Sequence, residues 1–283
     1  MNYSNVVTPD GFDFKIQTFD SIHDLTDYLS KATPSAIFRH GDCSSQMQTS
    51  DYGWYGTKNY QEAQDLLTGG WLPEAAVLAK KIPVSSVMGQ TIKKTANYSV
   101  VGFQASVPRY LQGLPTNMIN YRNTPQKQKI VVLNRCITFN ASWSSAKIEA
   151  EGIKALQVIQ ALEGNGFRVK LNIIAINGIK GRNGWNKSNS DVAVAKICVK
   201  KPEEPLNLSK IAFPLAHPAM LRRISFKWLE SFHEVTNDIF EATYGTAFVE
   251  WYSKIMAKGE HLMPNEIGNV DLYVKRITNR SQT

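Results

Sequence analysis

Four residues in one ten-residue stretch have the chemistry to bind a nucleic acid. Residues 178–187 contain Lys180, Arg182, Trp185 and Lys187, and the same stretch holds three glycines. Lysine and arginine side chains pair with phosphates, and an aromatic ring stacks on an unpaired base. Glycines allow a ligand to approach the backbone closely. The pattern indicates either a binding loop for single strands or an ordinary solvated turn, and the two readings are equally supported.

Positive charge is concentrated in an acid-free stretch between Glu74 and Glu149. These 74 residues hold ten lysines and arginines, whereas the whole chain has a net charge of only +8. A basic excess of this kind indicates a negatively charged partner, and it says nothing about the fold. The adjacent pair Arg222 and Arg223 either binds phosphates or forms a solvated helix face. The candidate nucleic-acid-binding residues are Lys93, Lys94, Arg109, Arg122, Lys127, Lys129, Lys180, Arg182, Trp185, Lys187, Arg222 and Arg223.

Residue types that catalyse reactions are present, but they form no recognisable constellation. The five histidines are dispersed, and the sequence contains no H-E-x-x-H, no G-x-x-x-x-G-K-[ST] and no G-x-S-x-G. The three cysteines are far apart, which fits neither a disulfide framework nor a zinc site. We therefore expect a protein that is not an enzyme, that uses no cofactor and that works in a reducing compartment.

One polar turn has the spacing of a metal site. Asn140, Ser142 and Ser144 follow an apolar run and precede a helical pattern. This N-x-S-x-S spacing resembles the D-x-S-x-S turn of von Willebrand A-like domains, which holds a divalent cation that grips a partner's carboxylate. Asn140 replaces the aspartate of that turn, so a hard cation would bind weakly here. The favoured alternative is a plain loop in which Ser144 caps the helix, and we expect no metal.

A second aromatic segment, Tyr52-Gly-Trp54-Tyr55-Gly56, allows two interpretations. It forms a stacking platform, or it pins a loop onto the core, and the second is the more common role of such residues.

The elements that must position these residues are clearest in the second half of the chain. Apolar runs predict strands, and an amphipathic pattern with one apolar stripe predicts a helix. A helix between two strands favours a parallel pair with a right-handed crossover. The predicted elements are strands at 130–139, 167–176, 191–200 and 269–277, and helices at 145–163, 206–232 and 236–257.

These elements predict an α/β fold. The part from about 130 to 283 resembles a von Willebrand A-like domain, which implies a sheet flanked by helices with residues 191–200 as an antiparallel edge strand. We place a smaller α+β region at 1–125 and the von Willebrand A-like α/β domain at 126–283. No apolar run approaches the ~20 residues of a membrane span, and we expect no signal peptide.

Three further stretches, 54–71, 107–119 and 212–223, are similar to an uncharacterised family of bacteriophage-encoded proteins. That resemblance implies a phage protein that acts in the host cytoplasm or in the virion.

The leading hypothesis is a non-enzymatic accessory protein that binds nucleic acid. We expect single-stranded DNA as the ligand, with DNA and RNA not distinguished by the residues, and phage transcription or replication as the setting. A phage or host polymerase or a replication protein is the expected protein partner. The alternative hypothesis is a von Willebrand A-like interaction module or a structural component of the virion. Neither hypothesis involves a membrane.

The loop at 178–187 generates the first prediction. Replacing Trp185 with alanine should weaken binding of single-stranded DNA by about 1–3 kcal/mol, the usual contribution of one stacked base. The thermal unfolding midpoint should hardly change, because a residue in an exposed turn buries little area. A titration and a melting curve test both parts. A sharply lower midpoint with unchanged affinity of the folded fraction would instead make Trp185 a core residue.

Overall fold

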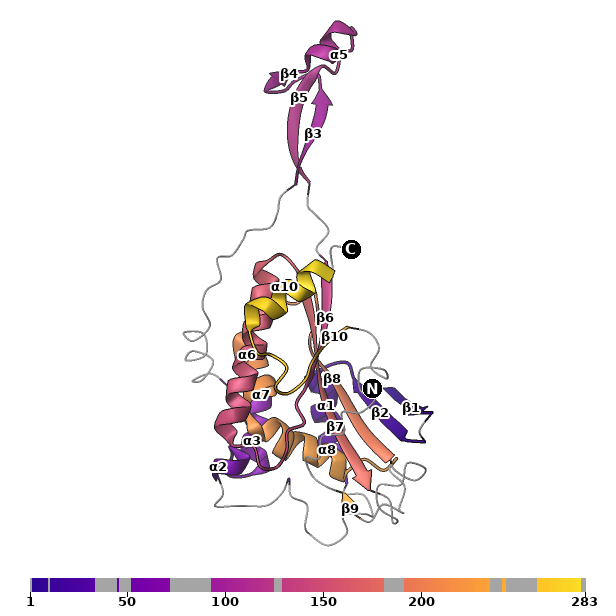
Figure 1. The fold of residues 1–283 in the computed structure, drawn as a ribbon, viewed down its shortest axis with the longest axis vertical. Helices are drawn as coiled ribbons and strands as arrows, with labels where there is room; N and C mark the ends of the chain where they lie inside the picture. The colour runs from indigo at the N-terminus through magenta and orange to yellow at the C-terminus, as the bar shows by residue number, and fades with distance from the viewer. Residues whose placement is uncertain are drawn as a thin grey trace.

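The structure is a computed structural model that describes residues 2–9, 11–33, 45, 52–71, 93–124, 129–180, 191–234, 241–242 and 259–280. It shows a mixed α/β protein with a large sheet, a layer of helices and a small sheet that lies apart from them (Figure 1). The predicted α/β class is therefore confirmed. In the described part of the chain, no helix is both long and apolar enough to cross a membrane.

The large sheet has seven strands of mixed direction. Six of them form a continuous path in the order β1-β2-β8-β7-β6-β10, and β9 pairs with the end of β7. Their bounds are β1 Asn2–Val7, β2 Asp13–Phe19, β6 Ile130–Cys136, β7 Arg168–Lys180, β8 Asp191–Lys200, β9 Glu241–Ala242 and β10 Glu260–Leu262.

The centre of this sheet matches the predicted elements. Strands β6 and β7 are parallel, as expected for two strands joined by a helix, and β8 runs antiparallel to β7. The expectation that residues 191–200 form an edge strand is wrong, because β2 pairs with β8 along its other side. The region 1–125 thus shares its sheet with the region 126–283. This pairing joins residues about 180 positions apart, and no local pattern in the sequence indicates it.

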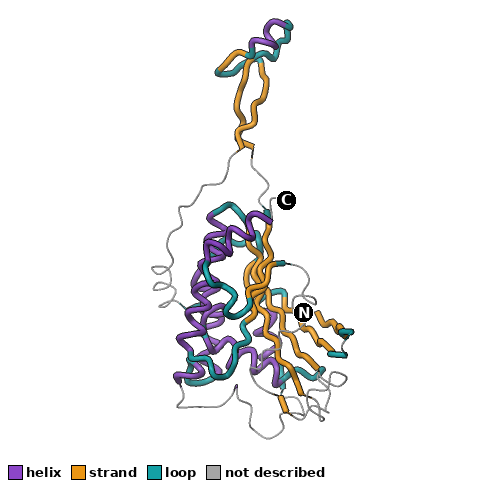
Figure 2. Tube along the Cα trace, viewed as in Figure 1, coloured by secondary structure: helices purple, strands orange, loops and turns teal. Residues whose placement is uncertain are grey.

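The helices pack on one face of the large sheet, here called the helix face (Figure 2). Alternate residues such as Ile173 and Ala175 of β7 point into this layer, whereas Ile174 and Ile176 belong to a separate cluster on the second face. No described helix packs on that second face. The helices are α1 Ile22–Lys31, α2 Tyr52–Tyr55, α3 Tyr60–Gly69, α6 Ser145–Gly164, α7 Leu208–Ala216, a π-helix Met220–Ser225, α8 Phe226–Glu230 and α10 Val270–Arg280.

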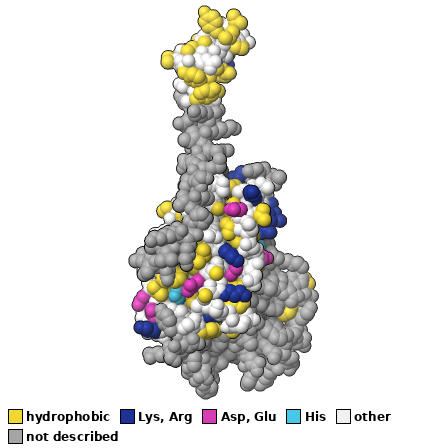
Figure 3. Space-filling model, turned by 60° about the vertical axis from the view of Figure 1, so that its left-hand side comes forward, with side chains coloured by type: hydrophobic (Ala, Val, Ile, Leu, Met, Phe, Trp, Pro, Cys, Tyr) yellow, Lys and Arg dark blue, Asp and Glu magenta, His cyan; other side chains and the backbone are white. Residues whose placement is uncertain are grey.

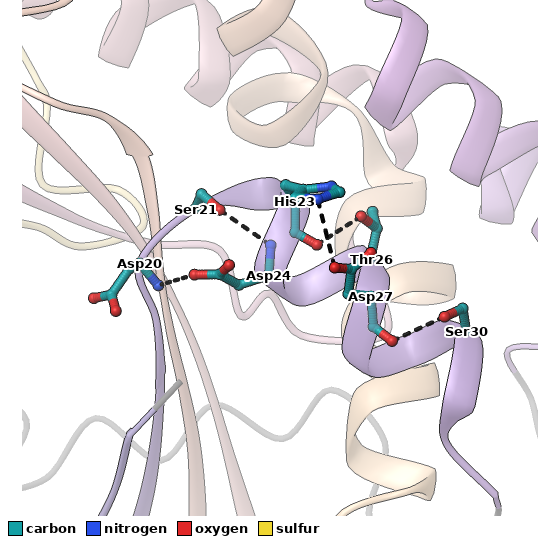
Figure 4. Close-up of polar contacts among 7 residues, drawn as sticks. All are labelled: Asp20, Ser21, His23, Asp24, Thr26, Asp27 and Ser30. Atoms are coloured by element: carbon teal, nitrogen blue, oxygen red, sulfur yellow. Dashed lines mark hydrogen bonds and ion pairs between the residues drawn. The ribbon is translucent and has the colours of Figure 1, made fainter.

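The start of α1 shows how local sequence fixes a boundary (Figure 4). The Ser21 hydroxyl accepts a hydrogen bond from the Asp24 amide at 3.0 Å, and the Asp24 carboxylate accepts one from the Asp20 amide at 3.1 Å. The first bond is the N-cap interaction, which satisfies an amide that would otherwise lack a partner at the helix start, and the second ties the residue before the cap to the first turn. The helix therefore begins directly after β2 and turns its buried residues Leu25 and Leu29 onto the helix face.

The last element differs from the prediction. Residues 269–277 were expected to form a strand, but Val270–Arg280 is the helix α10. The buried side chains of Tyr273, Val274 and Ile277 follow helical spacing, whereas Leu272 is exposed. The Asn269 side chain caps the start by accepting a hydrogen bond from the Leu272 amide at 3.1 Å. Alternating and helical patterns coexist in this segment, and packing against α6 selects the helix.

Helices α6 and α7 approach one another at Gly152. A Cβ atom placed there would lie 2.3 Å from the Ala216 Cα and 2.7 Å from the Leu215 carbonyl oxygen. Only glycine permits this contact, because backbone atoms cannot move aside as a flexible side chain can.

Gly152→Ala should therefore destabilise the fold by about 1–3 kcal/mol through overpacking, although alanine is the better helix former. Urea unfolding followed by circular dichroism measures the change. Gly69→Ala is the matched control, since nothing lies within 4 Å of a Cβ atom at that helical position. Equal stability of the two variants would contradict the close approach of α6 and α7.

Candidate nucleic-acid interface

The small sheet comes from the middle of the acid-free stretch. Its strands pair antiparallel in the order β3-β5-β4, and the short helix α5 lies between β4 and β5. Residues 93–124 contain four lysines and arginines and neither aspartate nor glutamate. Every formal charge of this segment is therefore positive. The bounds are β3 Lys93–Ser99, β4 Gln104–Ala105, α5 Val107–Leu111 and β5 Met118–Thr124.

The described side chains of this sheet form no hydrophobic core of their own. Of its residues whose side chains the structure describes, only Ser106 is buried. Large hydrophobic side chains cover most of the visible surface of the small sheet (Figure 3). A sheet of so few strands gains little stability unless something covers an apolar face. The exposed side chains are Tyr98, Val100, Val101, Phe103, Val107, Tyr110, Leu111 and Tyr121.

Three aromatic side chains gather on one face of the small sheet, here called the aromatic face. Tyr98 pairs with Ile119, and Tyr121 pairs with Ala96, so both tyrosines project from the same side of the pleat. Phe103 stacks on Tyr121, with ring centroids 5.0 Å apart and an interplanar angle of 27°. These rings remain 43%, 61% and 50% exposed at Tyr98, Phe103 and Tyr121, respectively.

Arg109 completes the aromatic face. Its guanidinium carbon lies 4.3 Å from the centre of the Tyr98 ring. Its Nε donates to the Thr116 carbonyl oxygen at 2.9 Å, and its Nη2 donates to the Thr116 hydroxyl at 3.0 Å. These bonds fix the cation over the ring before any ligand arrives. Arg109 therefore orients Tyr98 and adds positive charge at its face.

The arrangement can stack unpaired bases beside fixed positive charge. An aromatic ring with an open face accepts any base, and nearby cations attract the phosphates that link the bases. Sequence reasoning found the cations of this segment but missed Tyr98, Phe103 and Tyr121. Ala96 and Tyr98 are two positions apart in the sequence, and so are Ile119 and Tyr121. Once the two strands are paired, this spacing places all four side chains on one face.

The other candidate residues fall into three groups. Lys129 is exposed and precedes β6. Lys93, Lys94, Arg122 and Lys180 lie within strands, but their side chains are outside the described set. Lys127, Arg182, Trp185 and Lys187 lie outside the described residues altogether, so their role stays a prediction.

Arg222 and Arg223 occupy a different environment from the one expected. They were expected on an accessible helix face, but they are 1% and 0% exposed. Arg222 donates to the carbonyl oxygens of Trp54 at 2.5 Å and Trp143 at 2.6 Å. Arg223 donates to the Ser45 carbonyl oxygen at 3.0 Å and also reaches two carbonyls of the 57–58 segment. Buried carbonyl groups need donors, and these two guanidinium groups supply them.

The aromatic segment at 52–56 is pinned to this arginine pair. The Arg222 guanidinium lies 4.1 Å from the centre of the Trp54 ring, and that of Arg223 lies 3.8 Å from the Tyr55 ring. The Trp54 indole donates to the Ala141 carbonyl oxygen at 2.9 Å. This agrees with the interpretation of the segment as a loop held on the core.

The turn after β6 is closed by its own side chains. The Asn140 Oδ1 atom accepts from the Ser142 amide at 3.0 Å and from the Ser142 hydroxyl at 3.1 Å. Ser144 caps α6 by accepting from the Lys147 amide at 3.3 Å. The described residues contain no group of three or more histidine, cysteine, aspartate or glutamate side chains that could hold a metal ion.

Comparison with known proteins identifies a family without an assigned activity. A family model described as a domain of unknown function (DUF7192) matches residues 8–279, so the chain belongs to that family. No curated protein and no solved structure matched the chain.

The closed turn generates a prediction about cations. Millimolar Mg²⁺ or Mn²⁺ should leave the thermal unfolding midpoint of the protein unchanged, because Asn140 carries no charge and its oxygen already has two donors. Differential scanning fluorimetry provides the measurement. Asn140→Asp is the matched variant, since it adds only the missing charge. A saturable rise in the unmodified protein would reveal a site that binds the folded state and would contradict the prediction.

Proposed function

We propose that this chain, a member of the DUF7192 family, binds single-stranded nucleic acid on the aromatic face of its small sheet. The observation that carries the proposal is the set of exposed rings in a segment without a single acidic residue. Covering those rings with bases would give the small sheet the apolar burial that it lacks by itself. Single-stranded DNA is the ligand that we propose.

A single strand fits this surface better than a duplex does. Bases in a duplex are stacked on one another, so their faces cannot reach Tyr98 or Tyr121. The small sheet presents no helix of the kind that reads a major groove, since α5 has only five residues. Backbone phosphates of a single strand can follow the positive charges of the same segment.

The proposed role is that of an accessory protein which does not itself catalyse a reaction. The setting that we propose is phage transcription or replication in the host cytoplasm, and it rests on the resemblance of residues 54–71, 107–119 and 212–223 to a phage-encoded family. A polymerase or a replication protein is the partner that such a role requires. The large sheet would then serve as the body that carries the small sheet and contacts that partner.

A von Willebrand A-like interaction module is the second candidate function. It is favoured by the order of β6, the N-x-S-x-S turn, α6, β7 and the antiparallel β8, together with β10 lying parallel beside β6. In that case the turn at Asn140 would face a protein partner without a cation.

Alanine at Tyr98 or Tyr121 tests the leading proposal. Each substitution should weaken binding of a fluorescent single-stranded oligonucleotide by about 1–3 kcal/mol, because one base loses its stacking partner. The dependence on salt should stay nearly unchanged, since no phosphate contact is removed. Fluorescence anisotropy at two salt concentrations measures both quantities.

The matched control is Tyr3→Ala. Tyr3 is 46% exposed, close to the value for Tyr98, but it lies in β1 of the large sheet. Its loss should leave affinity unchanged. Absence of binding by the unmodified protein at about 50 mM salt, where phosphate contacts contribute strongly, would overturn the proposal. The exposed rings would then be assigned to a protein partner.

A further inference from the structure

The outermost strand of the large sheet has an open edge. β1 pairs with β2 along one side, and in the part of the chain that the structure describes no strand pairs along its other side (Figure 1). The backbone N–H and C=O groups of such an edge form a template for another strand. All six residues of β1 are exposed, so its own side chains and the described elements leave the approach to that edge open.

The other edges of the two sheets carry the protection that natural sheets use, and β1 does not. Proteins keep edge strands from pairing by making them very short, by placing lysine or proline on them, or by bending them at a bulge. β10, β9 and β4 have three, two and two residues, and β3 carries Lys93 and Lys94. β1 has six residues without a charge or a proline, and its ladder with β2 has no bulge.

The alternation of side chains along β1 limits how another strand can add. The Tyr3 ring lies 6.3 Å from the ring of Phe232, which belongs to the cluster on the helix face. Asn5 and Val7 therefore share the face of Tyr3, and the residues between them lie on the second face. In an antiparallel ladder, opposed residues lie on one face of the sheet. A second copy of β1 can thus add only if Tyr3, Asn5 and Val7 oppose residues of that same set.

We propose that two copies of this chain associate through β1, antiparallel to each other, about a twofold axis at Asn5. This register opposes an aromatic residue to a β-branched one, which is a favourable cross-strand pair, and the two Asn5 amides can bond each other. An axis at Ser4 would instead oppose Tyr3 to Asn5 and leave Val7, which is 65% exposed, without a partner. The proposed pairs are Tyr3 with Val7, Ser4 with Val6, and Asn5 with Asn5.

A second copy fits this edge better than a charged peptide does. The strand carries no charge that would select such a peptide, and it brings no like charges together although each chain has a net charge of +8. The contact is isologous, so it uses β1 of both copies and closes, with β10 at the two ends of the joined sheet. One strand pair is small beside a standard interface of about 1,600 Å², so the dimer should be weak and depend on concentration. The inference does not depend on the aromatic face.

Sedimentation equilibrium over a range of concentrations tests the association. The average mass should rise from that of one chain toward twice that value. Asn5→Glu should weaken the dimer severalfold, because two carboxylates would face each other across the axis at about 5 Å between Cα atoms. Within one chain the same carboxylate would lie opposite Lys15, so the thermal unfolding midpoint should not fall. Asn5→Gln is the matched control, since it has the size of glutamate without the charge, and it should keep the association.

The mass of one chain at every concentration would overturn the proposal, and so would equal association of Asn5→Glu and Asn5→Gln. Binding of a short single-stranded oligonucleotide by Asn5→Glu should be unchanged per chain, so failure of this contact and failure of the aromatic face give different results.

Cysteine cross-linking tests the register. Asn5→Cys should form a disulfide-linked dimer under mild oxidation, because residues opposed in an antiparallel ladder have Cα atoms within the range that a disulfide spans. Ser4→Cys should not, since its opposed residue is Val6 and the second Ser4 lies two positions further along the strand. The unmodified protein, treated in parallel, accounts for the natural cysteines. A dimer that cross-links through Ser4→Cys, or through neither variant, would contradict the axis at Asn5.

Discussion

Two neighbouring guanidinium groups hold together segments that lie far apart in the chain. Arg222 and Arg223 sit on a π-helix, a rare geometry, and bond backbone carbonyl groups near residues 45, 54, 57 and 143. A buried cation without acceptors costs several kcal/mol, and buried carbonyls without donors are also costly. Neither set can be buried without the other. The start of α6, the segment 52–58 that includes α2, and the π-helix are therefore fixed as one unit against the helix face.

The small sheet differs from the large sheet in how its apolar side chains are placed. The central strands of the large sheet bury most of their apolar side chains, whereas the small sheet leaves its rings in solvent. Its geometry is set by strand pairing and by Arg109, which joins Tyr98 to Thr116. Rings that are held in place before binding lose little conformational entropy when a ligand covers them. The two sheets therefore differ in kind: one is the floor of a packed core, and the other keeps its apolar side chains exposed.

Local patterns in the sequence were sufficient to predict much of the central fold. The apolar runs at β6, β7 and β8 and the stripe of α6 are long and regular, so their types and the parallel pairing of β6 with β7 could be predicted. The pairing of β2 with β8 could not, because it depends on a contact between distant residues. The burial of Arg222 and Arg223 could not be predicted either. The sequence of a basic pair is the same whether its partners are phosphates or backbone carbonyl groups. Tyr98 and Tyr121 escaped notice because their common face appears only once β3 and β5 are paired.

The pairing of β3 with β5 has a consequence for how this protein can change over evolutionary time. Lys93 and Thr124 are partners in the ladder, so the chain enters and leaves the small sheet through neighbouring residues. An insert with adjacent ends can be lengthened, exchanged or lost without moving the strands on either side of it. Members of the family can therefore retain one body and vary the inserted module. If the small sheet is the binding surface that we propose, differences in ligand preference among relatives should be concentrated between the positions equivalent to residues 93 and 124.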